Sequence, residues 1–192
     1  MKNIEQKVKR WRYLGIDDAP FGDRRGSKVL VVGAVCRGTV FEGLVSTHIR
    51  KDGWNASRKI SEMICKSKFH RQLHVILLDG IAVGGLNIVD LPFLHENTGL
   101  PVVTVMRKKP DLKAMENAFL RLPKPSRRMS LIERAGPVHD GGKVFFQAAG
   151  LSSSDIRAIL SELSIHGHIP EPVRLAHLIA RGVTTGESGK RA

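Results

Sequence analysis

His74-Val-Ile-Leu-Leu-Asp-Gly80 is the stretch of sequence that decides the fold. The run is short and almost wholly apolar, a pattern typical of a strand in a sheet that is covered on both faces. It ends at the polar step Asp79-Gly80, so we expect Asp79 at the carboxyl end of a buried central strand. The stretch therefore predicts an α/β protein with helices on both faces of its sheet.

Upstream of this run, the sequence predicts three strands and a helix. The strands are expected at residues 12–18, 28–36 and 39–50. The tight Arg37-Gly38 connection between the last two favours an antiparallel meander. Apolar residues then recur at helical spacing, which predicts a helix over residues 55–68.

Downstream, helices and strands alternate. We expect helices at 87–97 and 110–122, and between them a buried strand at 101–105. Beyond them we expect a Pro-rich basic loop at 123–128, a hairpin of 131–134 with 144–147, and helices at 152–163 and from Pro170. The order βββ-α-β-α-β-α predicts an RNase H-like mixed sheet, with three antiparallel strands extended by parallel ones.

The length of 192 residues fits one domain, which we expect to span residues 1–192. Within it, residues 1–11 form a basic N-terminal arm and residues 184–192 a loose tail. No apolar stretch approaches the roughly 20 residues needed to cross a bilayer, and no apolar segment follows the basic N-terminus. We therefore expect a cytoplasmic protein that does not enter a membrane.

The charge of the chain favours a polyanionic partner. Lys and Arg number 31 against 18 Asp and Glu, which gives a formal net charge of +13. Such an excess attracts nucleic acid through counterion release, although anionic membranes attract basic proteins too. Cys36 and Cys65 have no CxxC or Cys/His pairing of the kind that closes a zinc site. We expect nucleic acid as the partner, and no obligate protein partner.

Two aspartates end strands that are expected to lie side by side. Asp17 and Asp79 would then share one mouth of the sheet, where two carboxylates can hold Mg²⁺ against a phosphodiester. Taken singly, a strand-end aspartate more often bonds to turn amides. Asp18 competes with Asp17, because alternate side chains of a strand point to opposite faces. For a third carboxylate, Asp52 is favoured and Glu62 is the alternative.

Basic residues and a histidine complete the candidate site. Arg107, Lys108 and Lys109 follow the strand expected beside that of Asp79, where they could meet the scissile phosphate. Other candidates for nucleic-acid binding are the backbone of Gly80 and the basic side chains Lys124, Arg127 and Arg128, although a solvated loop explains the last three almost as well. His177 lies on the last expected helix; it is either structural or positioned to ligate a metal, orient water or shuttle a proton.

Four segments resemble motifs of endonuclease V, a metal-dependent repair nuclease of RNase H-like fold. They are Leu14-Gly-Ile-Asp17, Val75-Ile-Leu-Leu-Asp-Gly80, Val105-Met-Arg-Lys-Lys109 and Ile169–His177, whose Pro-Glu-Pro-Val-Arg-Leu-Ala-His is the most specific. The closer likeness is to the endonuclease dU family, an archaeal, endonuclease V-like group proposed to act at deoxyuridine. Nearly the whole chain resembles it, including Asp52-Gly53 and Gly84–Asp90.

This resemblance implies the identity of the metal and the roles of the residues. Mg²⁺ or Mn²⁺ would be bound by Asp17, Asp79 and Asp52, with His177 assisting and Lys108 meeting the phosphate. It also selects Asp17 over Asp18. Two features depart from endonuclease V, which has a Glu where Asp52 stands here and a Pro-Tyr wedge that this chain lacks. Candidate aromatic replacements for the wedge are Phe21, Phe41, Trp54 and Phe93.

The expected function is metal-dependent hydrolysis of phosphodiester bonds in nucleic acid, by an endonuclease acting in DNA at or near deaminated bases such as deoxyuridine. DNA is favoured over RNA, although no residue is seen to recognise or exclude a 2′-hydroxyl. The alternatives are a nuclease acting on RNA and a nucleic-acid-binding protein without catalysis, in which the carboxylates are structural.

Overall fold

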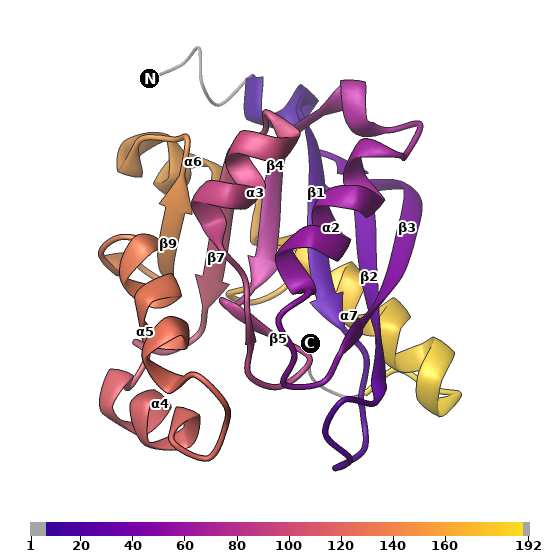
Figure 1. Ribbon diagram of the computed structural model, residues 1–192. Coiled ribbons are helices and arrows are strands. Elements are labelled where there is room, and N and C mark those ends of the chain that lie inside the picture. The colour runs from indigo at the N-terminus through magenta and orange to yellow at the C-terminus, as the bar shows by residue number, and fades with distance from the viewer. Residues whose placement is uncertain (1–6, 190–192) are drawn as a thin grey trace.

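A computed structural model describes residues 7–189 of the chain. Its centre is a seven-stranded sheet in the order β3-β2-β1-β4-β7-β9-β8 (Figure 1). The strands are β1 (Arg12–Asp18), β2 (Lys28–Arg37), β3 (Val40–Arg50), β4 (Leu73–Asp79), β7 (Val102–Met106), β8 (His139–Asp140) and β9 (Phe145–Ala149). The short strands β5 (Ala82–Val83) and β6 (Asn87–Ile88) pair separately.

The strand pairings confirm the expected RNase H-like arrangement. β1, β2 and β3 form an antiparallel meander. β4 then pairs parallel with β1, and β7 pairs parallel with β4. β9 closes the series antiparallel to β7. Since β3 also runs parallel to β1, the carboxyl ends of β1, β3, β4 and β7 lie at the same end of the sheet.

Helices cover both faces of this sheet (Figure 1). They are α2 (Ala56–Cys65), α3 (Leu91–Thr98), α4 (Leu112–Phe119), α5 (Pro125–Arg134), α6 (Ser153–Leu163) and α7 (Glu171–Thr185). A 3-10 turn, η1 (His70–Gln72), precedes β4. In β1 the side chains alternate between two cores: Leu14 and Ile16 pack with α2 and α3, and Tyr13 packs with α6 and α7. One side of β1 therefore faces α7, and the other faces α2 and α3.

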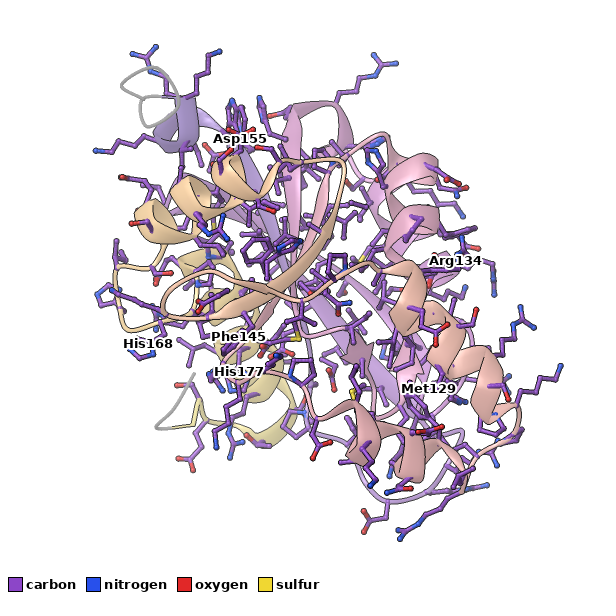
Figure 2. The ribbon with its side chains drawn as sticks, turned by 90° about the vertical axis from the view of Figure 1, so that its left-hand side faces the viewer. Met129, Arg134, Phe145, Asp155, His168 and His177 are labelled. Atoms are coloured by element: carbon purple, nitrogen blue, oxygen red, sulfur yellow. The ribbon has the colours of Figure 1, made fainter. Side chains whose placement is uncertain are left out.

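The segment after α4 corrects the sequence prediction. Residues 125–134, expected as part of a loop and the first strand of a hairpin, form the helix α5; Figure 2 labels Met129 and Arg134 on it. Pro125 occupies the start of the helix, where a missing amide costs nothing, and Arg128 and Ile132 bury the same side of it. The pairing partners of β9 are β7 and the two-residue β8.

Smaller differences lie at the ends of elements. The helix expected from Asn87 begins at Leu91, because Asn87 belongs to β6 and the Asp90 side chain caps the helix. Thr184 and Thr185, expected in a loose tail, form the last turn of α7. Residues 1–6 of the basic arm and 190–192 of the tail lie outside the described residues. Within residues 7–189, no helix is long and apolar enough to span a bilayer.

Candidate metal-binding site

Asp17, Asp79 and His177 converge at the carboxyl ends of β1 and β4. One ligand atom of each lies within 4.8 Å of those of the other two. His177 Nδ1 is 2.7 Å from Asp17 Oδ2, and the other carboxylate oxygen, Oδ1, accepts a hydrogen bond from the Asp18 amide at 2.8 Å. Figure 2 labels His177 on α7. Residues from the first strand, a central strand and the last helix thus form one group.

Strand register explains why the two aspartates meet. Ile16 of β1 lies opposite Leu78 of β4, so the next residues along these parallel strands, Asp17 and Asp79, are neighbours. Asp17 has the same side-chain parity as Tyr13, which places it on the face that α7 covers. The carboxylates are therefore presented toward the helix that carries His177.

A glycine in β1 lets α7 reach this face. A Cβ atom at Gly15 would overlap the backbone of Pro172 and Val173, so only glycine permits the observed approach of the helix to the strand. Pro172 stands in the first turn of α7, at whose start the Glu171 carboxylate pairs with Arg174. The Gly-Ile-Asp and Pro-Glu-Pro segments are therefore two sides of one contact, and this contact positions His177 beside Asp17.

The group concentrates negative charge in a partly buried place. Burial, followed by the charge of Asp17, raises the pKa of Asp79 to about 6, although Arg107 and His177 act in the opposite direction. The hydrogen bond to Asp17 raises the pKa of His177 above its usual value, against the effect of burial. Carboxylates held together in this way favour the binding of a cation.

Asp18 adds a third carboxylate from the other side of the strand. Burial and the charge of Asp17 raise its pKa to about 7, the charge of Asp79 adds to this, and a hydrogen bond from the Gly84 amide lowers it. From the sequence, Asp18 was expected only as a competitor of Asp17. The alternation of side chains does separate the two residues, but at the end of a strand both remain close enough to interact electrostatically.

The donor set fits a hard divalent cation. Two carboxylates and one imidazole offer oxygen-rich ligation, and carboxylates suit Mg²⁺ and Mn²⁺, whereas the structural zinc sites of proteins are dominated by thiolates and imidazoles. The remaining positions around Mg²⁺ are commonly filled by water and by substrate phosphate oxygens. The residues present therefore match the kind of ion that the sequence suggested.

Asp52, expected as the third metal ligand, lies outside this group. It follows β3 in a turn with a φ of 53°, its Oδ1 accepts a hydrogen bond from the Leu86 amide at 2.9 Å, and its own amide bonds to Gly84 O. The turn directs the carboxylate back into the protein, where it joins the end of β3 to the β5–β6 hairpin. Its role in this structure is to hold that hairpin.

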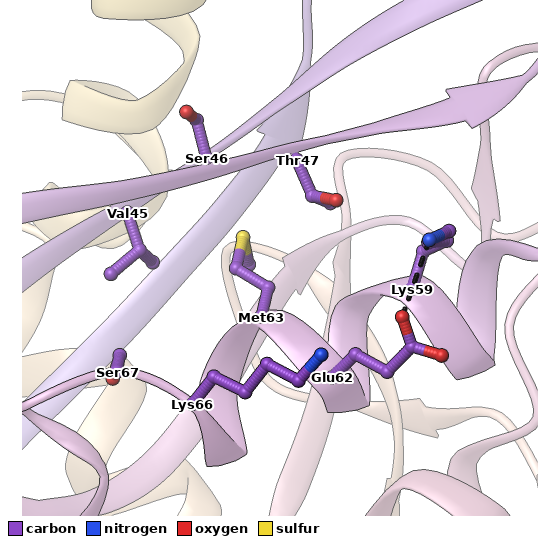
Figure 3. Close-up of a pocket in the computed structure, with 8 residues that line it drawn as sticks. All are labelled: Val45, Ser46, Thr47, Lys59, Glu62, Met63, Lys66 and Ser67. Carbon is purple, nitrogen blue, oxygen red and sulfur yellow. Dashed lines mark hydrogen bonds and ion pairs between the residues drawn. The ribbon is translucent and has the colours of Figure 1, made fainter.

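Glu62, the alternative third ligand, is also elsewhere. It pairs with Arg58 and Lys59 on the exposed side of α2. There it lines a cavity of about 450 Å³ between β3 and α2, shown in Figure 3 with Lys66 and Met63. Glu62 is therefore not part of the group formed by Asp17, Asp79 and His177.

Of the expected phosphate-binding residues, those after β7 are best placed. Arg107, Lys108 and Lys109 are exposed directly beyond the end of β7. The charge of Arg107 lowers the pKa values of both Asp79 and His177, so its guanidinium lies near the site. The Gly80 amide, by contrast, donates to Val105 O at 2.9 Å and is occupied in extending the sheet. It is therefore not available to a phosphate.

Part of the basic segment 124–128 lies on the surface and part of it is buried. Lys124 and Arg127 are exposed at the start of α5. Arg128, expected to contact nucleic acid, has no exposed surface. Its guanidinium donates to the carbonyls of Asp52, Gly53 and Leu86 and stacks on the Trp54 ring, so it supports the protein from within. The helical spacing of Arg128 and Ile132 was the sequence signal that could have predicted this burial.

The sequence matches the family described as Endonuclease dU over residues 9–184. It is 41% identical to a UPF0215 protein of Archaeoglobus fulgidus (96% of this chain, 100% of that one) and 42% identical to one of Methanopyrus kandleri (94% and 95%). A crystal structure from A. fulgidus, 41% identical, superposes with a TM-score of 0.86 (92% and 99% covered).

Endonuclease V structures share the fold at low sequence identity. That of Bacillus subtilis has a TM-score of 0.61 at 13% identity, covering 92% of this chain and 81% of the other. Endonuclease V of Ciona intestinalis, solved in complex with DNA containing an inosine followed by a ribo-adenosine, has a TM-score of 0.53 at 14% identity, covering 91% and 90%.

Proposed function

The chain belongs to the endonuclease dU family, and we propose that it is a divalent-metal-dependent endonuclease that cuts DNA at or near deoxyuridine. The nuclease activity is supported by the family and by a fold shared with endonuclease V. The observation that carries the proposal is the convergence of Asp17, Asp79 and His177 at the ends of two adjacent parallel strands. The complex of the Ciona enzyme with DNA supports nucleic acid as the substrate.

Asp17, Asp79 and His177 would hold Mg²⁺ or Mn²⁺ in this proposal. Such an ion supplies two things at a phosphodiester: it lowers the pKa of water and stabilises charge on the leaving oxygen. Asp18, whose pKa is raised to about 7, lies close enough to enlarge the negative field that attracts the ion. The Asp18 carboxyl must lose its proton before it contributes a full negative charge to this field.

The protein's own groups orient and neutralise the substrate. The hydrogen bond between His177 Nδ1 and Asp17 fixes the direction of the imidazole and, in the metal-free protein, raises the pKa of His177. Metal binding at His177 would require the neutral ring. Arg107 supplies positive charge beside Asp79, where it can compensate the charge of the scissile phosphate. Lys108 and Lys109, exposed beyond it, suit the flanking phosphates.

Cleavage assays on matched oligonucleotides test the proposal. Duplexes and single strands that differ at one position, carrying deoxyuridine, deoxyinosine, thymidine or a ribonucleotide, are incubated with Mg²⁺, Mn²⁺ or a chelator. We expect metal-dependent cutting next to deoxyuridine. Preferred cutting at the ribonucleotide would instead identify an RNA-directed nuclease, and binding without cutting in every lane would leave a nucleic-acid-binding protein.

Variants of the site separate catalysis from binding. Asp17→Asn and Asp79→Asn should bind DNA and fold but lose cutting by about a hundredfold or more, because each removes a carboxylate that would hold the ion. Asp18 does not replace Asp17, since its side chain points to the opposite side of the strand. Asp111→Asn is the matched control, since Asp111 caps α4 on the surface and asparagine caps a helix as well. Full activity in either site variant would refute the assignment.

A further inference from the structure

A second cavity lies on the face of the sheet opposite α7. It has a volume of about 270 Å³, close to the lower end of the range for small-ligand pockets. Trp54, Ile88, Phe93 and Leu131 give it apolar walls, and its polar groups include Asp90 and Arg127. Aromatic rings with a few polar side chains are the composition that receives a flat heteroaromatic ring.

Trp54 is an exposed aromatic residue on a rigid support. Its side chain remains 41% exposed although it follows directly on the turn that ends β3. The guanidinium of the fully buried Arg128 lies 4.2 Å from the centroid of its ring, and that guanidinium is fixed by carbonyls of Asp52, Gly53 and Leu86. The protein therefore holds the indole in place before any ligand arrives, which lowers the entropic cost of stacking.

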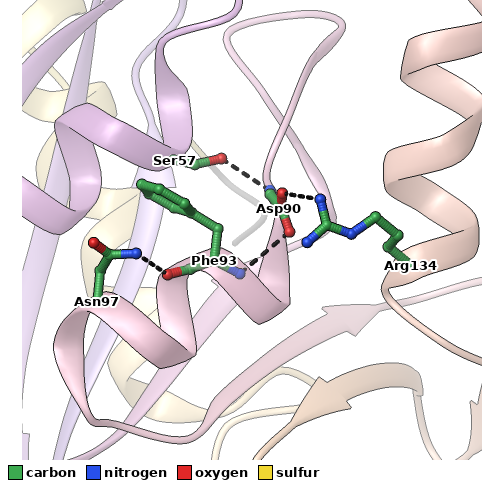
Figure 4. A network of polar contacts seen from close by, with 5 residues as sticks. All are labelled: Ser57, Asp90, Phe93, Asn97 and Arg134. Carbon is green, nitrogen blue, oxygen red and sulfur yellow. Dashed lines mark hydrogen bonds and ion pairs between the residues drawn. The ribbon is translucent and has the colours of Figure 1, made fainter.

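The polar wall is equally well fixed. Figure 4 shows Asp90 at the centre of a network in which its carboxylate accepts from the Phe93 amide and from Arg134, while its own amide donates to Ser57 Oγ. A carboxylate has about four lone-pair positions, so Asp90 retains capacity to accept a further hydrogen bond. Arg127 is exposed, and its guanidinium lies 5.3 Å from the Trp54 ring centroid. It can donate to a carbonyl or pair with a phosphate.

The cavity is connected to the candidate metal site through a short series of contacts. Arg128 and the Asp52 carboxylate both hold Leu86, and Asp52 also bonds to Gly84. The Gly84 amide in turn lies close enough to the Asp18 carboxylate to lower its pKa, and Asp18 is next to Asp17. Trp54 follows the carboxyl end of β3, the end of the sheet at which β1 and β4 also finish. The cavity and the candidate metal site therefore lie at the same end of the sheet.

We propose that the cavity walled by Trp54, Phe93 and Asp90 binds an unpaired nucleobase of the nucleic-acid strand held at Asp17 and Asp79. This inference rests on the proposed function. Stacking on Trp54 would provide affinity for any base, as aromatic platforms do for single strands. Asp90 and Arg127 offer an acceptor and donors to the polar edge of the ring, and Arg127 also neutralises the attached phosphate. A base inside a duplex is stacked on both sides and cannot enter.

Tryptophan fluorescence reports on the cavity independently of cleavage. The chain has two tryptophans, so Trp11→Phe leaves Trp54 as the sole emitter. Combined with Asp79→Asn to prevent cutting, this variant is titrated with three duplexes: one with a single bulged nucleotide, one with an abasic residue in the bulge, and one fully paired. We expect saturable quenching by the bulged duplex only.

The matched control carries Trp54→Phe in place of Trp11→Phe. Its remaining tryptophan, Trp11, stacks on His74 at the beginning of β4, the opposite end of the sheet, and should not respond to any duplex. In parallel, Trp54→Ala should weaken binding of the bulged duplex, measured by anisotropy, by about tenfold and leave binding of the paired duplex unchanged.

Three outcomes would overturn the proposal. The first is tight binding of the bulged duplex without quenching of Trp54, and the second is equal quenching by the abasic bulge. The third is equal quenching by free deoxyuridine at the same concentration, which would point to a nucleoside site. Cleavage is measured separately, with the protein in which Asp79 is intact. Cutting of DNA without quenching of Trp54 fluorescence would refute only base binding in the cavity. Quenching of Trp54 without cutting would refute only the nuclease activity.

Discussion

At the scale of single residues, the carboxylates of the site repel one another. Asp17, Asp18 and Asp79 lie close together, and the pKa values of Asp18 and Asp79 are raised to about 7 and about 6, from 3.8 in both cases. Burial is the largest cause of both shifts, followed by the charge of Asp17. A cation bound among them would relieve this repulsion, so in the metal-free protein the carboxylates oppose folding.

The metal-free protein should lose stability as the pH rises. Between about pH 4 and pH 7 the folded state holds protons on Asp18 and Asp79 that the unfolded chain has released, so the free energy of unfolding falls across this window. The raised pKa of His177 acts in the same direction. Thermal unfolding in chelator at pH 5 and pH 8 measures the effect, and a higher melting temperature at pH 8 would contradict it.

The variant Asp79→Asn identifies the source of this effect. It removes one of the repelling charges, so it should raise the melting temperature at pH 8, on the order of 3 °C, but not at pH 4.5. Asp111→Asn, at an exposed helix cap, should leave the pH dependence unchanged.

At the scale of elements, the contact between β1 and α7 determines whether His177 reaches Asp17. Neither element carries the site alone, because the strand supplies the carboxylate and the helix the imidazole. Gly15 is the residue that allows their backbones to approach. Its role follows from packing against a helix more than 150 residues away in the sequence, which no local pattern reveals.

Gly15→Ala should therefore displace α7 and weaken the metal site. The added Cβ would meet the backbone of Pro172 and Val173, which cannot move as a flexible side chain does, so we expect a loss of about 3 kcal/mol in the free energy of unfolding. Mn²⁺ affinity should fall as well, because His177 moves with the helix. Urea unfolding and calorimetric titration measure the two quantities.

Gly22→Ala is the control for this substitution. Gly22 has nothing within 4 Å of an added Cβ, and its backbone is not among the glycines with positive φ. It should retain both stability and metal affinity. If both substitutions lowered stability and Mn²⁺ affinity equally, the close approach of α7 to β1 would not be the cause of these losses.

Elements also show where sequence patterns succeed and fail. The central strand β4 was predictable because a short, unbroken apolar run that ends in Asp79 is typical of a buried strand and of few other structures. The helix α5 was not, because its proline and basic residues are equally typical of a loop, and the burial of Arg128 depends on carbonyls from two distant turns. The position of Asp52 was not predictable for the same reason: the conformation of its turn is set by hydrogen bonds with Gly84 and Leu86.

At the scale of the whole molecule, the parallel order of β1, β4 and β7 gathers the candidate functions at one end of the sheet. The acidic group, the basic residues after β7 and the cavity at Trp54 all lie there, although they come from segments spread over most of the chain. The net charge of +13 gives the chain a long-range attraction for polyanions. The acidic centre would hold the metal ion, and the basic residues after β7 would help to bind the strand.

Anomalous diffraction from crystals grown with Mn²⁺ locates the ion without reference to activity. We expect a manganese peak within coordinating distance of the Asp17 and Asp79 carboxylates, with His177 beside it. A peak at Asp52 or Glu62 would refute the assignment of the metal site, and so would the absence of a peak at Asp17 and Asp79 in crystals of a protein that cuts DNA with Mn²⁺.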